Sequence, residues 1–216
     1  MEQPGLKNLD TRQPSLEQLY KYFVEQDHQV IAFPQENKVV GKGIVNEGPN
    51  STRLGLKGIP ALAEELQIAR DLYLLEYTGG KLHIPTISTK GSVDLIRKAK
   101  ANKLDVSCSV AVHNLVFTDD TLHTFNTDYK VSPPLRTQED IDALLEGLKD
   151  GTIDMVTSDH NPLNIEHKKT EFEYAQYGTT GLESAFGALN TVVTTKAAVK
   201  YLTRGKSRFG IEAHSI

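Results

Sequence analysis

The chain has 216 residues, of which 38% are hydrophobic and 24% charged, and its formal net charge at pH 7 is −4. This composition predicts an ordinary folded protein and excludes a disordered tail. Acidic and basic residues are mixed along the chain without a basic stripe, and no apolar run could cross a bilayer, so neither nucleic acid nor a membrane is an expected partner.

Short apolar runs alternate with amphipathic helical patterns along the whole chain. Residues 15–27 predict a helix with Ser15 as its N-cap. Its apolar stripe contains Leu16, Leu19, Tyr20 and Phe23. The apolar run 30–33 then indicates a buried strand, and a loop rich in Gly, Asn and Pro follows from residue 34 to about residue 58.

Residues 59–77 form the longest helical pattern, which ends at Gly79 and Gly80. The stripe expected to face the core comprises Leu62, Leu66, Ala69, Leu72 and Tyr73. A second face carries Glu64, Glu65 and Arg70. We therefore predict a single buried side for this helix.

Residues 82–87 are strand-like, and Ser92 is the predicted cap of the following helix, which carries Val93, Ile96 and Ala99. Residues 105–112 alternate apolar and small polar side chains with the period of a strand. A helix is expected from Thr137 to Gly151, with Ile141, Leu144, Leu145 and Leu148 facing inward. A strand at 153–157 and a last helix at 181–195 complete the pattern.

Strands separated by helices of this length predict βα units around a parallel sheet. Polar residues cluster just after the strands, which favours part of a (β/α)8 barrel of the TIM type. A doubly wound open sheet is the competing architecture, but no strand is followed by a G-x-G-x-x-G turn.

Several segments, in order, resemble the dihydroorotases of the amidohydrolase superfamily. They are residues 46–56, 58–65, 87–89, 129–136 (YKVSPPLR), 147–154, 158–162 (SDHNP) and 178–183. The resemblance runs from about Leu16 to the end. It implies that residues 1–216 form one partial, metal-dependent hydrolase barrel, roughly the second half with strands five to eight. The implied reaction is the interconversion of N-carbamoyl-aspartate and dihydroorotate in pyrimidine biosynthesis, driven by a zinc-bound hydroxide.

The sequence departs from this family at the expected zinc ligands. The strand ending at Phe33 would finish with a histidine in the family, and Thr86 stands where a second histidine is expected. A phenyl ring offers no lone pair, and a threonine hydroxyl is a poor zinc ligand beside imidazole. His83 is an unlikely replacement, because an odd offset along a strand turns it to the opposite face from Thr86. We therefore expect no zinc in this chain.

Substrate contacts are also changed. The family positions are Ser132, where an asparagine is expected, His160, and Leu163, where a histidine is expected. Asp159 is the only retained candidate for catalysis and metal binding, as the metal-linked proton carrier implied by the resemblance. Alternatively, Asp159 caps or turns the chain after its strand, which is the preferred interpretation here. No His-x-His pair occurs anywhere in the chain.

Other polar residues have plain structural explanations. His160 either touches a ligand or bonds backbone groups in a loop, and His113 is expected to be structural. Cys108, the single cysteine, is predicted to lie in the core, and its inability to form an internal disulfide fits a reducing cytoplasm. Asn46 and Arg53 either hold a carboxylate or order their loop, and loop ordering is preferred.

Residues 166–169 are predicted to be a solvated loop or the remnant of a lid. In the same region, Phe172, Tyr174 and Tyr177 pack either over an empty pocket or against another subunit, and the sequence leaves this choice open.

A partial barrel exposes sheet edges and an apolar sheet face, so the chain is expected either to be part of a longer protein or to form homo-oligomers. Three functions remain open. The first is a non-catalytic scaffold, of the kind that in this family partners aspartate carbamoyltransferase. The second is an active dihydroorotase completed by an N-terminal half outside this chain. The third is a small-molecule binder that reuses the pocket.

Overall fold

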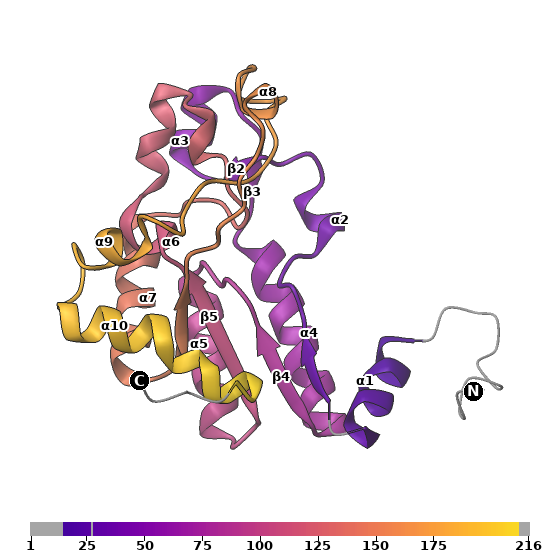
Figure 1. The fold of residues 1–216 in the computed structure, drawn as a ribbon. Coiled ribbons are helices and arrows are strands. Elements are labelled where there is room, and N and C mark those ends of the chain that lie inside the picture. Colours follow the sequence, from indigo (N-terminus) through magenta and orange to yellow (C-terminus); the bar gives the residue numbers. More distant parts are fainter. Residues whose placement is uncertain (1–14, 27, 212–216) are drawn as a thin grey trace, which may run out of the picture.

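The computed structural model describes residues 15–26 and 28–211 (Figure 1). Its centre is a four-stranded parallel sheet in the order β1-β4-β5-β6. The strands are β1 (Gln29–Ile31), β4 (Lys81–Ile84), β5 (Val106–Ala111) and β6 (Met155–Thr157). Spatial order follows chain order without a reversal, whereas a doubly wound sheet reverses at a switch point. The predicted parallel sheet is confirmed, and the order matches part of a barrel wall.

Helices cover one face of this sheet. The helices α4 (Leu62–Thr78), α5 (Lys90–Ala101) and α7 (Gln138–Asp150) pack side by side, α5 between the other two. The apolar side of β5 faces them, with Val106, Cys108, Val110 and Val112 buried in the main core. The Cys108 side chain is fully buried, and burial raises the pKa of its thiol to about 12. The prediction that Cys108 belongs to the core is confirmed.

Local sequence signals explain where α5 and α7 begin and end. Thr137 caps α7 in a capping box with Asp140, and Gly151 ends it with a left-handed φ of 84°. The cap of α5 is Thr89, whose Oγ1 accepts a hydrogen bond from the Ser92 backbone N–H at 3.1 Å. The prediction that Ser92 is the cap is therefore wrong, because the helix starts one turn earlier. The buried face of α5 is as predicted.

The strand predicted at residues 30–33 was expected to be buried on both faces, and it is buried on one face only. Val30 and Ala32 pack against the core, but Ile31 is 61% exposed and Phe33 49% exposed. Successive side chains alternate between the two faces of a strand. Ile31 and Phe33 therefore lie on the face without α4, α5 and α7, at the edge strand of the sheet.

The longest helix also differs from its prediction. Gly58–Ile59 form a short strand, β3, and α4 begins only at Leu62. Its buried side contains Glu64 and Leu72, whereas Leu62, Leu66 and Tyr73 of the predicted inner stripe are exposed. Gly79 ends the helix with a positive φ, as predicted.

At the N-terminal end, α1 (Leu16–Glu25) begins at Ser15 in a capping box, as predicted. Tyr20 is buried against α4 and the core, but Leu19 of the same predicted stripe is exposed. The helix therefore docks through a narrower face than the pattern predicts.

An upper lobe, defined as residues 37–59, 117–131 and 165–178, sits above the carboxyl ends of the strands (Figure 1). Its elements are α2 (Asn37–Val40), β2 (Val45–Asn46), α3 (Pro49–Leu54), β3, η1 (Asp119–Thr124), η2 (Thr127–Tyr129) and α8 (Ile165–Lys168). The prediction of a loop from residue 34 to about residue 58 is wrong, because α2, β2 and α3 lie in this range. The lobe has its own small core of Val45, Leu122 and Phe172.

The last part of the chain follows β6. The helix predicted at 181–195 is wrong, because α9 covers only Ala185–Leu189 and a new helix, α10 (Thr195–Thr203), starts after the Thr194 cap. α10 packs on β6, and η3 (Arg204–Phe209) follows it. The remaining short helix, α6 (His113–Val116), directly follows β5.

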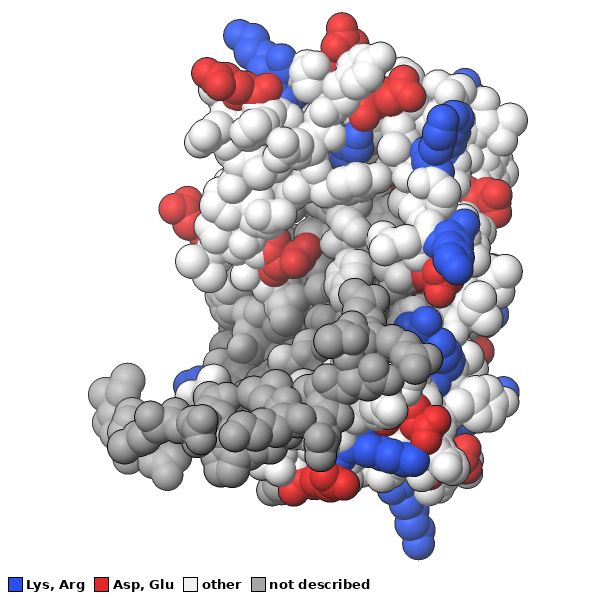
Figure 2. Space-filling view, turned by 90° about the vertical axis from the view of Figure 1, so that its right-hand side faces the viewer, with Lys and Arg blue, Asp and Glu red and all other residues white. Residues whose placement is uncertain are grey.

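Acidic and basic side chains are interspersed over the face shown in Figure 2, with neither sign gathered into a large patch. No helix within residues 15–26 and 28–211 is long and apolar enough to span a bilayer.

Candidate functional site

The candidate site lies at the carboxyl ends of the four parallel strands, beneath the upper lobe. Phe33 follows β1, Thr86 follows β4, His113 follows β5 and Asp159 follows β6. Parallel strands end at the same edge, so side chains from distant parts of the sequence meet there. This edge is where the sequence places its candidate residues.

The two positions at which zinc ligands were expected carry Phe33 and Thr86, and the two side chains differ in burial. Phe33 is about half exposed. Thr86 is buried, and its backbone N–H donates to Ser109 Oγ at 3.1 Å. Thr86 also has a φ of 49°, an uncommon and strained conformation for a β-branched residue. His83 bonds Ser107 Oγ at 2.9 Å and packs edge-to-face on Phe209 at 5.0 Å between ring centroids, contacts that leave it no role beside Thr86.

Asp159 and His113 face each other across the ends of β6 and β5. His113 Nε2 lies 3.8 Å from Asp159 Oδ2, which is too long for a hydrogen bond. His113 is buried, and neither of its ring nitrogens has a hydrogen-bond partner among the described residues. Burial lowers the pKa of His113 to about 4 and raises the pKa of Asp159 above its usual value.

At neutral pH the His113 imidazole is therefore neutral. Sequence reasoning treated His113 as structural, yet its ring makes none of the hydrogen bonds that anchor a structural histidine. Its position directly after a strand end was the signal that could have identified it. Asp159, with a φ of 46°, adopts the left-handed conformation that Asp tolerates in turns.

The residues present do not fit a zinc ion. Among the described residues, no three His, Cys, Asp or Glu side chains lie close enough together to hold a metal. Structural zinc sites use four protein ligands, and catalytic sites use three plus water. His113 and Asp159 supply only two donors, and Phe33 and Thr86 add no nitrogen or carboxylate to them.

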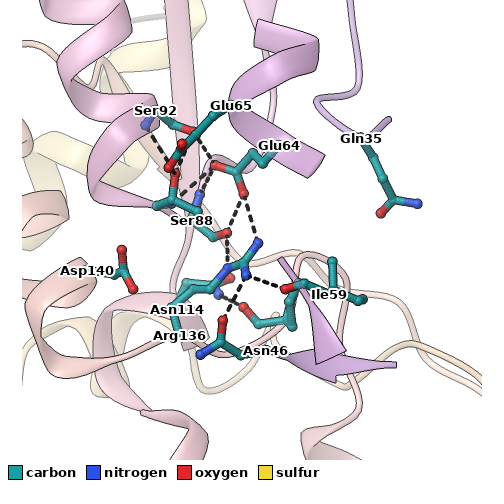
Figure 3. Close-up of polar contacts among 12 residues, drawn as sticks. Gln35, Asn46, Ile59, Glu64, Glu65, Ser88, Ser92, Asn114, Arg136 and Asp140 are labelled. Atoms are coloured by element: carbon teal, nitrogen blue, oxygen red, sulfur yellow. Dashed lines mark hydrogen bonds and ion pairs between the residues drawn. The ribbon is translucent and has the colours of Figure 1, made fainter. Parts of the chain in front are cut away.

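A buried polar network occupies the neighbouring space (Figure 3). The Arg136 guanidinium lies between Glu64 and Asn46, with Nη2 at 3.7 Å from Glu64 Oε2 and Nη1 donating to Asn46 Oδ1 at 2.8 Å. Its Nε donates to Ser88 Oγ at 3.1 Å. Arg136 and Glu64 are almost completely buried. A buried ion pair needs such additional hydrogen bonds to offset its desolvation.

Glu64 is also held by backbone and side-chain donors from the start of α5. Its Oε1 accepts from Ser88 N at 2.7 Å, Thr89 N at 3.2 Å and Ser92 Oγ at 2.7 Å, and its Oε2 accepts from Ser88 Oγ. The carboxylate thus accepts four hydrogen bonds from this chain, which makes Glu64 a structural anchor.

Asn46 extends the network into the upper lobe, where its Nδ2 donates to Asp119 Oδ2 at 2.8 Å. Asn50 donates to the other oxygen of Asp119 at 2.7 Å, and Arg53 in turn donates to Asn50 Oδ1 at 2.9 Å. Asn46 does hold a carboxylate, but one from this chain. The predicted role of Asn46 and Arg53 in ordering their segment is confirmed.

A small cavity lies between this network and the residues that follow β1 and β4. Its volume is about 10 Å³, which is roughly the space of one water molecule. Its lining includes Phe33, Gln35, Thr86, Pro134 and Arg136. A ring-shaped substrate does not fit there.

The three predicted substrate positions lie on two loops, with Ser132 before α7 and both His160 and Leu163 between β6 and α8. Ser132 Oγ donates a long hydrogen bond to Gln35 Oε1 at 3.5 Å. His160 Nδ1 accepts hydrogen bonds from the backbone N–H groups of Gly181 and Leu182 at 3.2 and 3.3 Å, which are the backbone contacts expected of a loop histidine. Leu163 is half-buried in the loop before α8.

Lys130, which sequence reasoning missed, fastens the 165–178 segment to the rest of the upper lobe. Its buried Nζ donates to the Phe172 and Glu173 carbonyls at 2.9 and 2.8 Å and lies over the Tyr177 ring. Phe172 is buried inside the lobe, whereas Tyr174 is exposed. Phe172 therefore packs neither over an empty pocket nor against a subunit.

The sheet, its one-sided helices and the polar strand ends define a partial (β/α) barrel of the TIM type. In solved structures, the fold is similar to the L-hydantoinase (dihydropyrimidinase) from Arthrobacter aurescens, with a TM-score of 0.77, 23% identity, and coverage of 90% of this chain and 46% of that one. It is also similar to the Saccharomyces cerevisiae dihydroorotase in complex with 5-fluoroorotic acid, with a TM-score of 0.71, 15% identity, and coverage of 90% and 53%. These similarities establish the fold as about half of a TIM barrel.

Sequence comparison is more specific. Residues 19–92 match the family model described as dihydro-orotase-like. The chain is 44% identical to the dihydroorotase of Caldanaerobacter subterraneus subsp. tengcongensis over 83% of this chain and 43% of that protein. It is 48% identical to the dihydroorotase of Ruminiclostridium cellulolyticum over 74% and 37%. The chain belongs to the dihydroorotase family, and it spans less than half the length of the curated relatives it matches.

Proposed function

We propose that this chain is a non-catalytic member of the dihydroorotase family that acts through the contacts it makes. The observation that carries the proposal is the set of side chains at the strand ends. Phe33 and Thr86 stand at two positions where the family resemblance implies zinc-binding histidines. Asp159 lies beside the His113 ring, with 3.8 Å between Asp159 Oδ2 and His113 Nε2. Two donors are fewer than a catalytic zinc requires.

The packing beside the strand ends supports the same proposal. The Glu64–Arg136 ion pair uses its own hydrogen-bonding groups within the chain, so these charges do not await a ligand. The cavity of about 10 Å³ is far smaller than the several hundred Å³ typical of small-molecule sites. Space and charge at this position serve the fold.

The partner implied by the resemblance is aspartate carbamoyltransferase. In this proposal the barrel stabilises or positions a partner enzyme of pyrimidine biosynthesis and does no chemistry itself. Co-purification of the two proteins, with a catalytic parameter of the transferase that changes on binding, would support this role. An unchanged transferase that does not bind the chain contradicts it.

An active dihydroorotase is the second candidate, and one observation favours it. Asp159 is retained, and burial raises the pKa of its carboxyl group. A raised pKa brings a carboxylate closer to the range useful for proton transfer. In that case the missing ligands would come from residues outside this chain.

Metal content and turnover decide between the two candidates. We would measure zinc by mass spectrometry and the hydrolysis of dihydroorotate, using the longest natural form of the protein. We expect neither bound zinc nor turnover. Stoichiometric zinc, together with turnover that Asp159→Asn abolishes, overturns the proposal.

A gain-of-ligand variant tests the physical reason. Phe33→His combined with Thr86→His adds two imidazoles at the strand ends and should raise zinc binding above that of the natural chain. Phe33→Leu combined with Thr86→Val is the matched control, because it changes the same positions without adding donors. Equal zinc content in both variants would show that these positions do not limit metal binding.

A further inference from the structure

One edge of the main sheet, at β6, carries a hollow along its length. β6 ends the order β1-β4-β5-β6, and among the described strands it pairs with β5 alone. The four consecutive residues 155–158 all line one hollow of about 490 Å³. Successive residues of a strand point to opposite faces, so a hollow that touches both kinds runs along the free edge. The backbone groups of such an edge are a template for pairing with another strand.

The walls of this hollow are apolar. Leu182, Phe186, Phe209 and Ile211 line it, and each is between 41% and 66% exposed. All four belong to the part of the chain that follows β6, so the chain builds the walls and leaves them open to solvent. Exposed apolar side chains gathered around one hollow mark a protein contact.

The amino end of the hollow is basic. Lys206 lines it, and a second hollow of about 630 Å³, which shares Met155 with the first, is lined by Arg204, Ser207 and Arg208. Residues 184–211 contain no acidic residue, although the net charge of the chain is −4. The basic residues in this range are Lys196, Lys200, Arg204, Lys206 and Arg208.

Nearby acidic groups leave part of this positive charge unpaired. Asp154 also lines the second hollow, but its Oδ2 accepts a hydrogen bond from Lys100 Nζ at 2.8 Å. Asp105 pairs with Arg208. The Arg204 guanidinium has no hydrogen-bond or ion-pair partner in the part of the chain that the structure describes. The amino end of β6 therefore offers a cation to an acidic group from outside the chain.

We propose that an extended, acidic segment of a partner protein binds here and adds to β6 as a parallel strand. The surface, which we call the β6 groove, comprises residues 155–158, the four apolar wall residues, Arg204 and Lys206. The main chain of the segment pairs with β6, and its apolar side chains enter the hollow. Acidic side chains at its amino-terminal end meet Arg204 and Lys206. A parallel direction continues the arrangement of the four strands already present.

This inference deepens the proposed function and rests on it, because a chain that acts through its contacts needs a contact surface. The two fail in different experiments. Zinc or turnover would overturn the loss of catalysis without involving the β6 groove. A β6 groove that binds no acidic segment would remove this surface and leave the metal argument intact.

Fluorescence polarisation on the full chain tests the proposal with a labelled synthetic peptide. The peptide has about eight residues, a common strand length, with two glutamates followed by alternating valine and threonine. Leu182→Asp places a charge in the apolar wall and Arg204→Glu reverses the charge at the amino end, so each should weaken binding roughly tenfold or more. Ile165→Asp and Lys169→Glu are the matched controls, because both residues are exposed but lie in the upper lobe.

Absence of binding, or equal weakening by the β6 groove variants and the controls, overturns the proposal. A peptide with lysines in place of the glutamates, and one with the glutamates at the carboxyl end, should each bind at least about tenfold more weakly. Equal affinity for the second would contradict the parallel direction. Stronger binding of an oligothymidylate of about ten nucleotides would assign the basic residues to nucleic acid instead. Binding that appears only after removal of residues 212–216 would assign the β6 groove to this chain's own C-terminal segment.

Hydrogen exchange separates strand addition from attraction between charges alone. The first peptide should slow exchange of backbone N–H groups within residues 155–157, because an added strand pairs with the free edge of β6. Slowing confined to the basic residues 196–208, with none in β6, would overturn the proposal.

Discussion

Replacing Glu64 with glutamine removes the charge on which the buried network beneath the upper lobe depends. One terminal atom of the new side chain becomes an NH₂ donor. In one orientation, this NH₂ group faces the backbone N–H groups of Ser88 and Thr89, which are themselves donors. In the other orientation, it faces the Ser88 hydroxyl, which donates to Glu64 in the natural chain, and the positively charged Arg136 guanidinium. Arg136 stays buried without its counter-charge. We therefore expect a large loss of stability.

The size of the loss follows from the burial of both partners. Glu64 is 3% exposed and Arg136 2% exposed, so solvent does not replace the missing interaction. Breaking a buried pair by removing one partner costs about 3–5 kcal/mol. For a chain of this length that corresponds to a fall in Tm of roughly 6–20 °C. The free energy of unfolding is measured by urea unfolding, followed by circular dichroism. The dependence of this free energy on urea concentration (the m-value) should be the same for the natural chain and the variant.

Two comparisons make the result specific. Glu65→Gln changes a neighbouring, partly exposed carboxylate that accepts one hydrogen bond from Thr89, and should cost less than about 1 kcal/mol. Glu64→Leu combined with Arg136→Met removes both charges and should cost less than the sum of the single changes. A loss below about 1 kcal/mol for Glu64→Gln, or strict additivity in the cycle, would refute the reasoning.

Further outcomes follow from other parts of the fold. Burial lowers the pKa of His83 to about 4, below the unfolded value of about 6.5, so stability should be complete above pH 6.5 and fall as pH drops towards 4. At pH 4.5, His83→Gln should restore about 2–3 kcal/mol of the lost free energy of unfolding, measured by urea unfolding. If the pH dependence of stability were the same with and without His83, burial of a neutral His83 would not be its cause. Lys130→Met should speed tryptic cleavage within residues 165–178, because the Phe172 and Glu173 carbonyls lose the ammonium group that donates to them. The far-UV circular dichroism spectrum should not change. An unchanged cleavage rate would contradict the role of Lys130 in holding this segment. Gly181→Ala should cost about 1–3 kcal/mol, because an added Cβ would lie 2.2 Å from the Ser158 carbonyl oxygen. Gly187→Ala, inside α9 with open space around it, should be neutral or stabilise by up to about 1 kcal/mol, and equal effects of the two changes would be inconsistent with this packing.

Sequence reasoning succeeded where one local signal dominates. Thr137 and Gly151 bracket α7 in both prediction and structure, because a capping box and a left-handed glycine act within a few residues. It failed where two signals compete. In α4, apolar residues lie on opposite sides, and the pattern alone does not show that Glu64 is the buried one. The charge of Glu64 is tolerated inside only because Arg136 arrives from far along the chain.

The candidate site was predictable in position but not in content. The strand ends were identified because βα units place polar residues there, and Phe33 and Thr86 were recognised as departures from the family. The approach of His113 to Asp159 could not be predicted from the sequence, because it depends on the register of β5 against β6. Likewise, the clamp made by Lys130 depends on carbonyl groups of residues 172 and 173, which carry no signature in the sequence.

The burial of Cys108 has a practical consequence for studying this chain. A thiol with a pKa of about 12 in the middle of β5 reacts with neutral-pH reagents only when the sheet opens. Its modification rate in the natural protein therefore reports the frequency of global opening, with no label introduced. The same chain also serves as a background in which any added surface cysteine is the fast-reacting one.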